Sequence, residues 1–292
     1  MRKFVQLTKL GGYCDAIYSP NGYYCALDRI NFHLVLFDDQ AESPPRQIYL
    51  DFSGRFSSIE RPYLIHFPKN PQILLIRYKT YEMGVFCFKK GEFIYHLPKI
   101  ENLTSVVCRG KNTFIFLKKA AKQPGEVRAV QCRFVLEVFK LKNKVKDKFI
   151  MANRKQFEQP KLVTLGPRGE HLLVYTDDGA WRMDGRIYIF RLNSKGKLTY
   201  LSCIDFSSRC EPNLGQFNCL KFHSYMKTKM VFSGFSIGVD IGLFTVVYDF
   251  RSKKVVLVKF LKTKLSTVRN LSLIDSSLHG VDDYCKKFEV RI

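Results

Sequence analysis

The chain has 292 residues, 46% of them hydrophobic, which is enough apolar material for one large domain or two smaller ones. Its 48 lysines and arginines stand against 26 aspartates and glutamates, and the resulting formal charge of +22 is typical of proteins that meet a polyanion such as nucleic acid, an anionic membrane surface or an acidic protein. No apolar run approaches the roughly 18–20 residues of a membrane span, so we expect no transmembrane association.

The nine cysteines are odd in number and lie scattered in apolar runs. This distribution is typical of reduced cysteines in a hydrophobic core and argues against a disulfide framework. The first residues are basic, but Gln6, Thr8 and Lys9 interrupt the apolar run that a secretory signal requires. We therefore expect a cytoplasmic or nuclear protein.

In chain order, short apolar runs rich in Val, Ile, Phe and Tyr alternate with turn residues, and each run has the length of a strand. The runs recur in a repeating order along the chain. In each repeat, one run ends in a charged or polar residue, which in most repeats directly follows an aromatic residue. These runs lie at 33–38, 84–89, 134–140, 186–191, 244–249 and 286–291. Each follows another apolar run, which itself follows a turn such as Pro20-Asn21-Gly22 or Pro167-Arg168-Gly169. A fourth apolar run comes after all of them except the last.

The repeating unit is therefore four strands long, and about 40–55 residues for four strands indicates a β-propeller. A four-stranded meander cannot bury both of its faces alone, whereas stacking against neighbouring blades covers them. We predict an all-β, six-bladed propeller of four-stranded antiparallel blades. Seven blades remain the alternative, since the long middle units have room for a further strand pair. No linker divides the repeats, so residues 1–292 are expected to form one domain.

The last unit, from about Val268 to Ile292, supplies three strands, and residues 3–10 form an unassigned strand before the first unit. We predict that this N-terminal strand closes the last blade.

Two segments resemble WD40-type propeller repeats: "SPNGYYCALDRINFHLVLFD" at 19–38 and "LHGVDDYCKKFEVRI" at 278–292. The Gly-His and Trp-Asp dipeptides of strong repeats are missing, so their internal hydrogen-bond set is not carried over. The resemblance implies a propeller fold and a scaffold role, and it names no specific partner.

In a four-stranded meander, the turns after the first and third strands lie on one face. Here these turns are rich in lysine, most densely in "KLKNKVKDK" at 140–148, where alternate lysines of an extended strand would share one side. The residues expected to bind a polyanion are Lys142, Lys144, Lys146, Lys148, Lys195, Lys197, Lys227, Lys229, Lys253 and Lys254. The alternative for the 140–148 run is a solvated hairpin whose lysines protect a strand edge.

The opposite face has a mixed charge and carries Trp181, the only tryptophan, in a loop with Asp177, Asp178 and Asp184. Tryptophan is favoured at the centre of protein interfaces. The residues expected to bind a protein partner are Trp181, Arg182, Lys118, Lys119 and Arg128.

Catalytic and metal sites find little support. Cys203, Cys210, Cys219 and His223 are zinc-ligand types, but their spacing matches no tight zinc knuckle, so we predict no metal and no cofactor. The six histidines are isolated, and no nucleophile motif or phosphate loop is present.

We therefore predict a non-enzymatic scaffold in a larger complex, with a basic face for an acidic partner. An RNA-binding propeller, associated with translation or the ribosome, is the first alternative. A propeller enzyme using channel carboxylates is the second.

Overall fold

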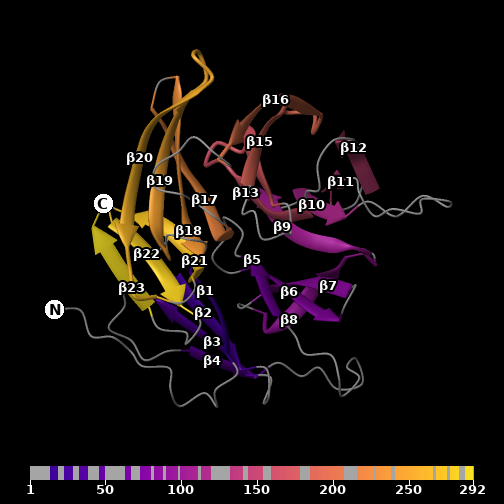
Figure 1. Cartoon of the computed structure of the whole chain (residues 1–292). Coiled ribbons are helices and arrows are strands. Elements are labelled where there is room, and N and C mark those ends of the chain that lie inside the picture. Colours follow the sequence, from indigo (N-terminus) through magenta and orange to yellow (C-terminus); the bar gives the residue numbers. More distant parts are fainter. Residues whose placement is uncertain are drawn as a thin grey trace, which may run out of the picture. The chain divides into compact units, whose positions relative to one another are not determined.

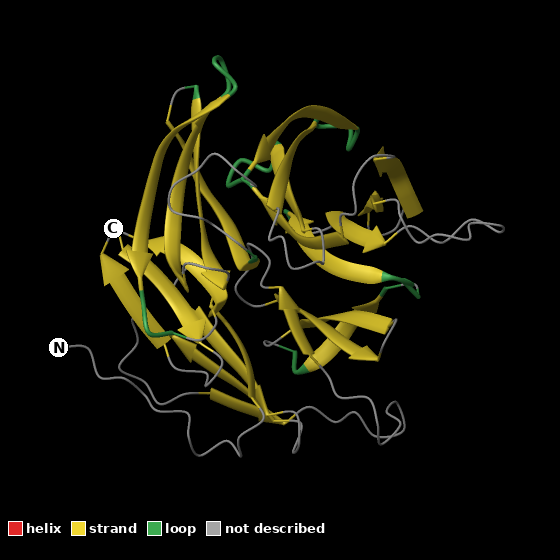
Figure 2. Cartoon of the chain, viewed as in Figure 1, coloured by secondary structure: helices red, strands yellow, loops and turns green. Residues whose placement is uncertain are grey.

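The computed structural model describes the strands and several of the turns between them. The described residues are 14–18, 23–28, 33–38, 46–49, 63–66, 73–79, 82–87, 90–97, 99–110, 113–119, 132–140, 144–153, 159–177, 185–206, 216–226, 228–237, 241–265, 268–274, 277–282 and 287–291. Within these ranges the chain is all β: strands joined by turns, with no helix (Figure 2). Consistent with this, the described part contains no helix of the length and apolarity that crossing a membrane requires.

Two compact units divide the chain, and each contains three antiparallel sheets (Figure 1). Unit 1 comprises residues 1–101 and 268–292, and unit 2 comprises residues 102–267.

The sheets of unit 1 follow the order of the chain. Their strands are β1 (Cys14–Tyr18), β2 (Tyr23–Asp28), β3 (His33–Asp38) and β4 (Arg46–Tyr49); β5 (Tyr63–His66), β6 (Ile73–Lys79), β7 (Glu82–Cys87) and β8 (Glu92–His96); and β21 (Val268–Ile274), β22 (Ser277–Asp282) and β23 (Lys287–Arg291). The first strand of one sheet, β1, lies against β5 of the second and β21 of the third.

Unit 2 repeats this arrangement. Its strands are β9 (Leu103–Arg109), β10 (Thr113–Lys119), β11 (Cys132–Lys140) and β12 (Lys144–Asn153); β13 (Gln159–Leu165), β14 (His171–Asp177), β15 (Gly185–Leu192) and β16 (Leu198–Asp205); and β17 (Phe217–Met226), β18 (Lys229–Ile237), β19 (Ile241–Asp249) and β20 (Lys254–Lys262). Again the first strands are neighbours, with β13 against both β9 and β17.

The predicted four-stranded units correspond to these sheets. Five of the described sheets have four strands, and the sheet near the C-terminus has three, as the sequence predicts for the last unit. The predicted closing strand at residues 3–10 lies outside the described residues.

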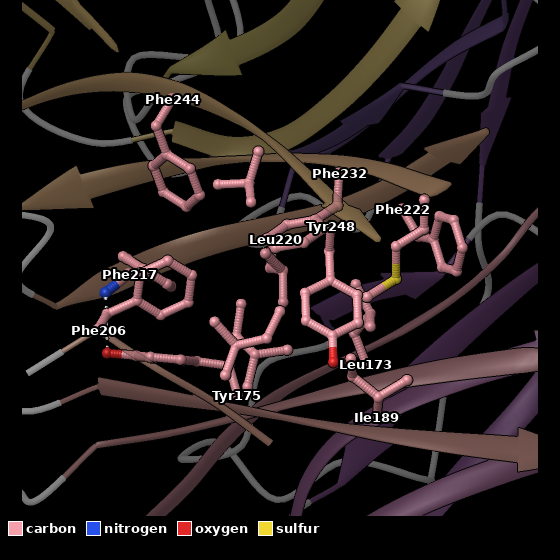
Figure 3. Packing of buried hydrophobic residues seen from close by; sticks show 14 residues of the cluster. Leu173, Tyr175, Ile189, Phe206, Phe217, Leu220, Phe222, Phe232, Phe244 and Tyr248 are labelled. Atoms are coloured by element: carbon pink, nitrogen blue, oxygen red, sulfur yellow. Dashed lines mark hydrogen bonds between the residues drawn. The ribbon is translucent and has the colours of Figure 1, made fainter. Parts of the chain in front are cut away.

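The middle sheet of unit 2 is buried on both faces, because successive residues of a strand point to opposite sides. Leu173 and Tyr175 of β14 join one hydrophobic cluster with β17, β18 and β19 (Figure 3). Leu172 and Val174 join a second cluster with β9, β10 and β11. Near-continuous apolar sequence in β14 and β15 therefore reflects a sheet covered on both sides.

Aromatic rings fill the first of these clusters. Phe217 of β17 stacks on Tyr175 with ring centroids 4.6 Å apart and meets Phe244 of β19 at 4.5 Å. The Tyr175 hydroxyl also accepts a hydrogen bond of 3.1 Å from the backbone N–H of Phe217 (Figure 3). This one hydrogen bond thus gives a partner both to the buried tyrosine oxygen and to the first backbone N–H of β17.

Candidate binding surface

Arg109 joins three turns of unit 2. It is the last residue of β9, and its guanidinium donates a hydrogen bond of 2.5 Å to the carbonyl oxygen of Asn193, in the turn between β15 and β16. Its side chain also lies against Gly169, in the turn between β13 and β14, where an added Cβ would be 3.2 Å from Arg109 Cγ and Nε. These contacts place the three turns at one end of their strands.

An aromatic pair extends this end to the next sheet. The ring of His171, which begins β14, lies 5.0 Å from the ring of Phe250, in the turn between β19 and β20. Burial lowers the pKa of His171; Glu170 raises it and Arg191 lowers it by smaller amounts. A largely neutral imidazole near pH 7 suits this packing against an apolar ring.

The turns at this end have defined backbone geometry. Gly196 adopts a φ of +89° and Lys253 a φ of 55°, a left-handed conformation that is uncommon for a residue with a side chain. The side chains of Asn193 and Asp249 accept hydrogen bonds from the backbone N–H groups of Lys197 and Arg251 at 2.9 and 2.8 Å. These bonds from side chain to backbone fix the turns and so fix where their lysines emerge.

We call this surface the basic turn end. Its cations among the described residues are Arg109, Lys140, Arg168, Lys195, Lys197, Lys229, Arg251, Lys253 and Lys254, and its acids are Glu170 and Asp249. Lys195, Lys197, Lys253 and Lys254 are exposed. In the part of the chain that the structure describes, these four lysines have no carboxylate within ion-pair distance.

The opposite end of the same strands differs, because several of its cations have polar partners. Lys118 pairs with Glu137 across β10 and β11, and Arg186 pairs with Asp205 at 3.1 Å across β15 and β16. Lys161 pairs with Asp177 at 3.5 Å. Asp177, predicted in a loop, is instead the buried last residue of β14.

Of the residues predicted to bind a protein partner, Lys118 and Lys119 are described. Lys118 is half-buried in its ion pair, and Lys119 is exposed and donates a hydrogen bond of 3.5 Å to the Gln159 side chain. Trp181, Arg182 and Arg128 lie outside the described residues, as do Lys142 and Lys227 of the predicted polyanion site.

Lys144, Lys146 and Lys148 belong to β12, for which the structure describes the backbone. Lys144 pairs with Lys140 and Lys148 pairs with Glu137, with a register shift between Val138 and Phe139. The prediction assumed an uninterrupted strand, and this bulge breaks the simple alternation of the backbone within the lysine run.

The four residues of zinc-ligand type form no metal site in the described part of the chain; they are Cys203, Cys210, Cys219 and His223. Cys203 and Cys219 lie in β16 and β17, as predicted, and both are free thiols. Burial raises the pKa of Cys203 to about 12, with a smaller opposing effect from Arg186. No group of three or more metal-ligating side chains occurs among the described residues, and Cys210 lies outside them.

Sequence reasoning did not single out Arg109, which contacts two other turns. The only local signal was the Arg-Gly pair at a turn. Its partners lie 60 and 84 residues away, so no local pattern could have identified them.

Comparison with solved structures supports the fold class. The β-propeller domain of Cps50 (Swd1) from Myceliophteria thermophila superposes with a TM-score of 0.58 at 9% identity, covering 99% of this chain and 98% of that one. A chain from the mitotic checkpoint complex gives a TM-score of 0.57 at 8% identity, covering 95% and 89%. No protein-family model matches the sequence, and no curated protein matches it significantly. The chain therefore has a β-propeller fold, established by structure alone.

Proposed function

We propose that the chain is a non-enzymatic, six-bladed propeller scaffold, one domain over residues 1–292, that binds an acidic protein partner on the basic turn end. The observation that carries the proposal is the set of exposed lysines on fixed turns that have no described carboxylate partner. Fixed, unpaired charges attract a polyanion at long range and give up no internal ion pair when it binds.

The remaining predicted features belong to the same proposal. Residues 3–10 supply the missing strand of the last blade. Trp181, with Arg182, Lys118, Lys119 and Arg128, forms a second contact for the protein partner. Likeness to a chain from a complex is consistent with a scaffold role, although it shows the fold alone.

The test is purification of the tagged protein from its own cells, with and without nuclease, followed by mass spectrometry of the bound proteins. The variant carries Lys195→Glu, Lys197→Glu, Lys253→Glu and Lys254→Glu. Lys90→Glu with Lys99→Glu is the control, because both lysines are exposed but already pair with Glu92 and Glu101. We expect companions that survive nuclease, are lost from the fourfold variant and remain on the control.

RNA is the second candidate, because unpaired lysines also suit phosphates. It predicts companions that disappear with nuclease, and an affinity for single-stranded RNA that falls steeply with salt. Companions that persist on the fourfold variant would overturn the assignment of the basic turn end.

A further inference from the structure

The strand β20 is the edge of its sheet. The hydrogen-bonded order is β17-β18-β19-β20, and among the described residues no strand pairs with the other side of β20. It is nine residues long, and Figure 1 shows it running beside β19 over its whole length. An edge strand presents a row of backbone N–H and C=O groups that can pair with another chain.

One side of β20 is fixed by the core. Val255, Val258 and Phe260 pack against the hydrophobic cluster of β14–β19. Gly242 of β19 allows β19 and β20 to approach each other closely. A side chain would not fit there, because an added Cβ would lie 2.3 Å from the Leu261 carbonyl oxygen. The backbone of β20 is therefore held in position for a further strand.

The exposed side chains of β20 are aliphatic or basic. Val256 is 51% exposed and Leu261 is 47% exposed, and Lys254, Lys259 and Lys262 are exposed beside them. No carboxylate within the described ranges lies at ion-pair distance from these lysines. The edge thus offers a partner both apolar side chains and positive charge. Among the described residues, no carboxylate of the same sheet pairs with that charge.

Two other edge strands have a different character. In β8, the exposed Glu92 pairs with Lys90 at 3.7 Å. In β16, the exposed Asp205 pairs with Arg186 at 3.1 Å. These strands also expose a large apolar side chain each, Ile94 in β8 and Tyr200 in β16. Mixed charges give an added strand no net attraction, so β20 is distinguished from them by its uniformly positive charge.

Lysines also protect edges from unwanted pairing, and a bulge serves the same purpose. The bulge in β20 lies near its start, where the register shifts between Val247 and Tyr248 of β19 and Val256 has no partner. From Leu257 to Lys262 the pairing is regular. A protected edge would also carry polar residues in place of Val256 and Leu261.

We propose that β20 binds an extended segment of a partner protein, rich in acidic and aliphatic residues, as a fifth strand of its sheet. Backbone pairing along 257–262 would supply affinity, and carboxylates opposite Lys259 and Lys262 would select the partner. The proposal rests on the scaffold function in requiring a protein partner, but it does not rest on the basic turn end.

The test uses the full chain, immobilised and exposed to a display library of random nine-residue peptides. The strongest binder is then synthesised with a fluorescent label, together with a copy carrying proline at its central position. Their affinities are measured by anisotropy for the wild type, for Lys259→Glu with Lys262→Glu, and for Lys195→Glu with Lys197→Glu as the matched control on the basic turn end. A ten-nucleotide oligo(U) serves as the competing polyanion.

We expect enriched peptides that carry aspartate or glutamate at two positions three residues apart, with valine, isoleucine or threonine between and around them, and in which proline is depleted. Binding should weaken about tenfold or more on the Lys259/Lys262 variant and with the proline peptide, which cannot complete the backbone pairing. It should be unchanged on the control variant. Hydrogen exchange should slow at the backbone amides of 257–262 when peptide is bound.

Four results would overturn the proposal. Peptides that bind equally well with central proline would show that no strand is added. Equal binding to the Lys259/Lys262 variant would place the peptide elsewhere, and loss on the control variant alone would place it on the basic turn end. Displacement of the peptide by oligo(U) at equal concentration would show a general polyanion surface. If no peptide binds β20 while acidic companions still depend on Lys195 and Lys197, the scaffold function stands without this edge.

Discussion

Gly234 lies in the middle of β18 at a point where no side chain fits. A Cβ added there would lie 2.4 Å from Phe244 Cζ and 2.6 Å from the Cys219 carbonyl oxygen. The backbone oxygen cannot move without distorting β17, so the clash is not relieved by a side-chain rotation alone. The glycine thus allows Phe244 to enter the cluster of Figure 3.

We therefore expect Gly234→Ala to lower the free energy of unfolding by about 2 kcal/mol or more. Urea unfolding monitored by tryptophan fluorescence or circular dichroism measures the change. The matched control is Ser236→Ala, two residues away in the same strand. Its buried hydroxyl has no hydrogen-bond partner in the described part of the chain, so its removal should cost little or should stabilise. Similar losses for both variants would contradict this explanation.

His223 makes the stability depend on pH. Burial, and to a smaller extent Lys221, lowers the pKa of His223 to about 3, and its buried Nε2 atom has no hydrogen-bond partner among the described residues. In the unfolded chain the same group takes up a proton near pH 6.5. Between these values the unfolded state binds more protons, so the folded state loses stability as the pH falls.

We expect the free energy of unfolding to fall below pH 6.5 by about 1.4 kcal/mol per pH unit from this group alone. His223→Gln should reduce the slope measured between pH 7 and 5, whatever its effect on stability at pH 7. The pKa of His171 is lowered in the same direction and contributes to the slope that remains. An unchanged slope would mean that His223 is accessible to protons in the folded protein.

At the scale of the elements, neighbouring sheets of unit 2 share polar links between their first strands. The Ser105 hydroxyl of β9 accepts a hydrogen bond of 3.3 Å from the Val163 N–H of β13. The Thr164 hydroxyl of β13 accepts one of 3.2 Å from the Phe222 N–H of β17. Because β13 and β17 are the first strands of their sheets, N–H groups on their outer side have no strand partner in that sheet, and hydroxyls from the preceding sheet accept their hydrogen bonds.

Thr164→Val should therefore cost about 1–3 kcal/mol, because it leaves the buried Phe222 N–H without an acceptor while conserving volume. Thr164→Ser keeps the hydroxyl and is the control, expected to cost less. Hydrogen exchange at the Phe222 amide should accelerate in the valine variant alone. Equal exchange rates in both variants would show that this bond does not hold β17 against β13.

The strand pattern was largely predictable because it is local. The predicted run at 33–38 coincides with β3, and the run at 186–191 lies within β15 (Gly185–Leu192). The run at 84–89 overlaps β7, but β7 spans Glu82–Cys87 and so begins two residues earlier than predicted. Alternation and turn residues report on a strand and its neighbours, and carry no information about which sheet packs on which.

For the whole molecule, the formal charge of +22 has a consequence for stability. Like charges repel more strongly when the chain is compact, and salt screens that repulsion. We expect the Tm to rise by a few degrees between about 20 and 300 mM NaCl at constant pH. A variant with Lys195, Lys197, Lys253 and Lys254 changed to glutamine should respond less. A Tm that falls with salt would indicate that attractive ion pairs dominate.

The candidate surface was predictable in part. Turn lysines such as Lys195 and Lys253 could be assigned to one end of the strands from meander topology, since that topology follows from strand order. The role of Arg109 and the exposed aliphatic residues of β20 could not. Both depend on contacts or exposure that involve residues far apart in the chain.

The sequence by itself determined an all-β chain of repeating four-stranded units with a large excess of positive charge. The repeat length, the turn residues and the composition can all be recognised from the sequence without knowing which strands pack together. Only the tertiary structure decided which cations are paired, as Lys118 is with Glu137, and which remain exposed, as Lys195 and Lys259 do. It also decided that β20 presents Val256 and Leu261 to solvent. Ion pairing and exposure depend on how strands are packed in space, and the same local pattern is compatible with either outcome.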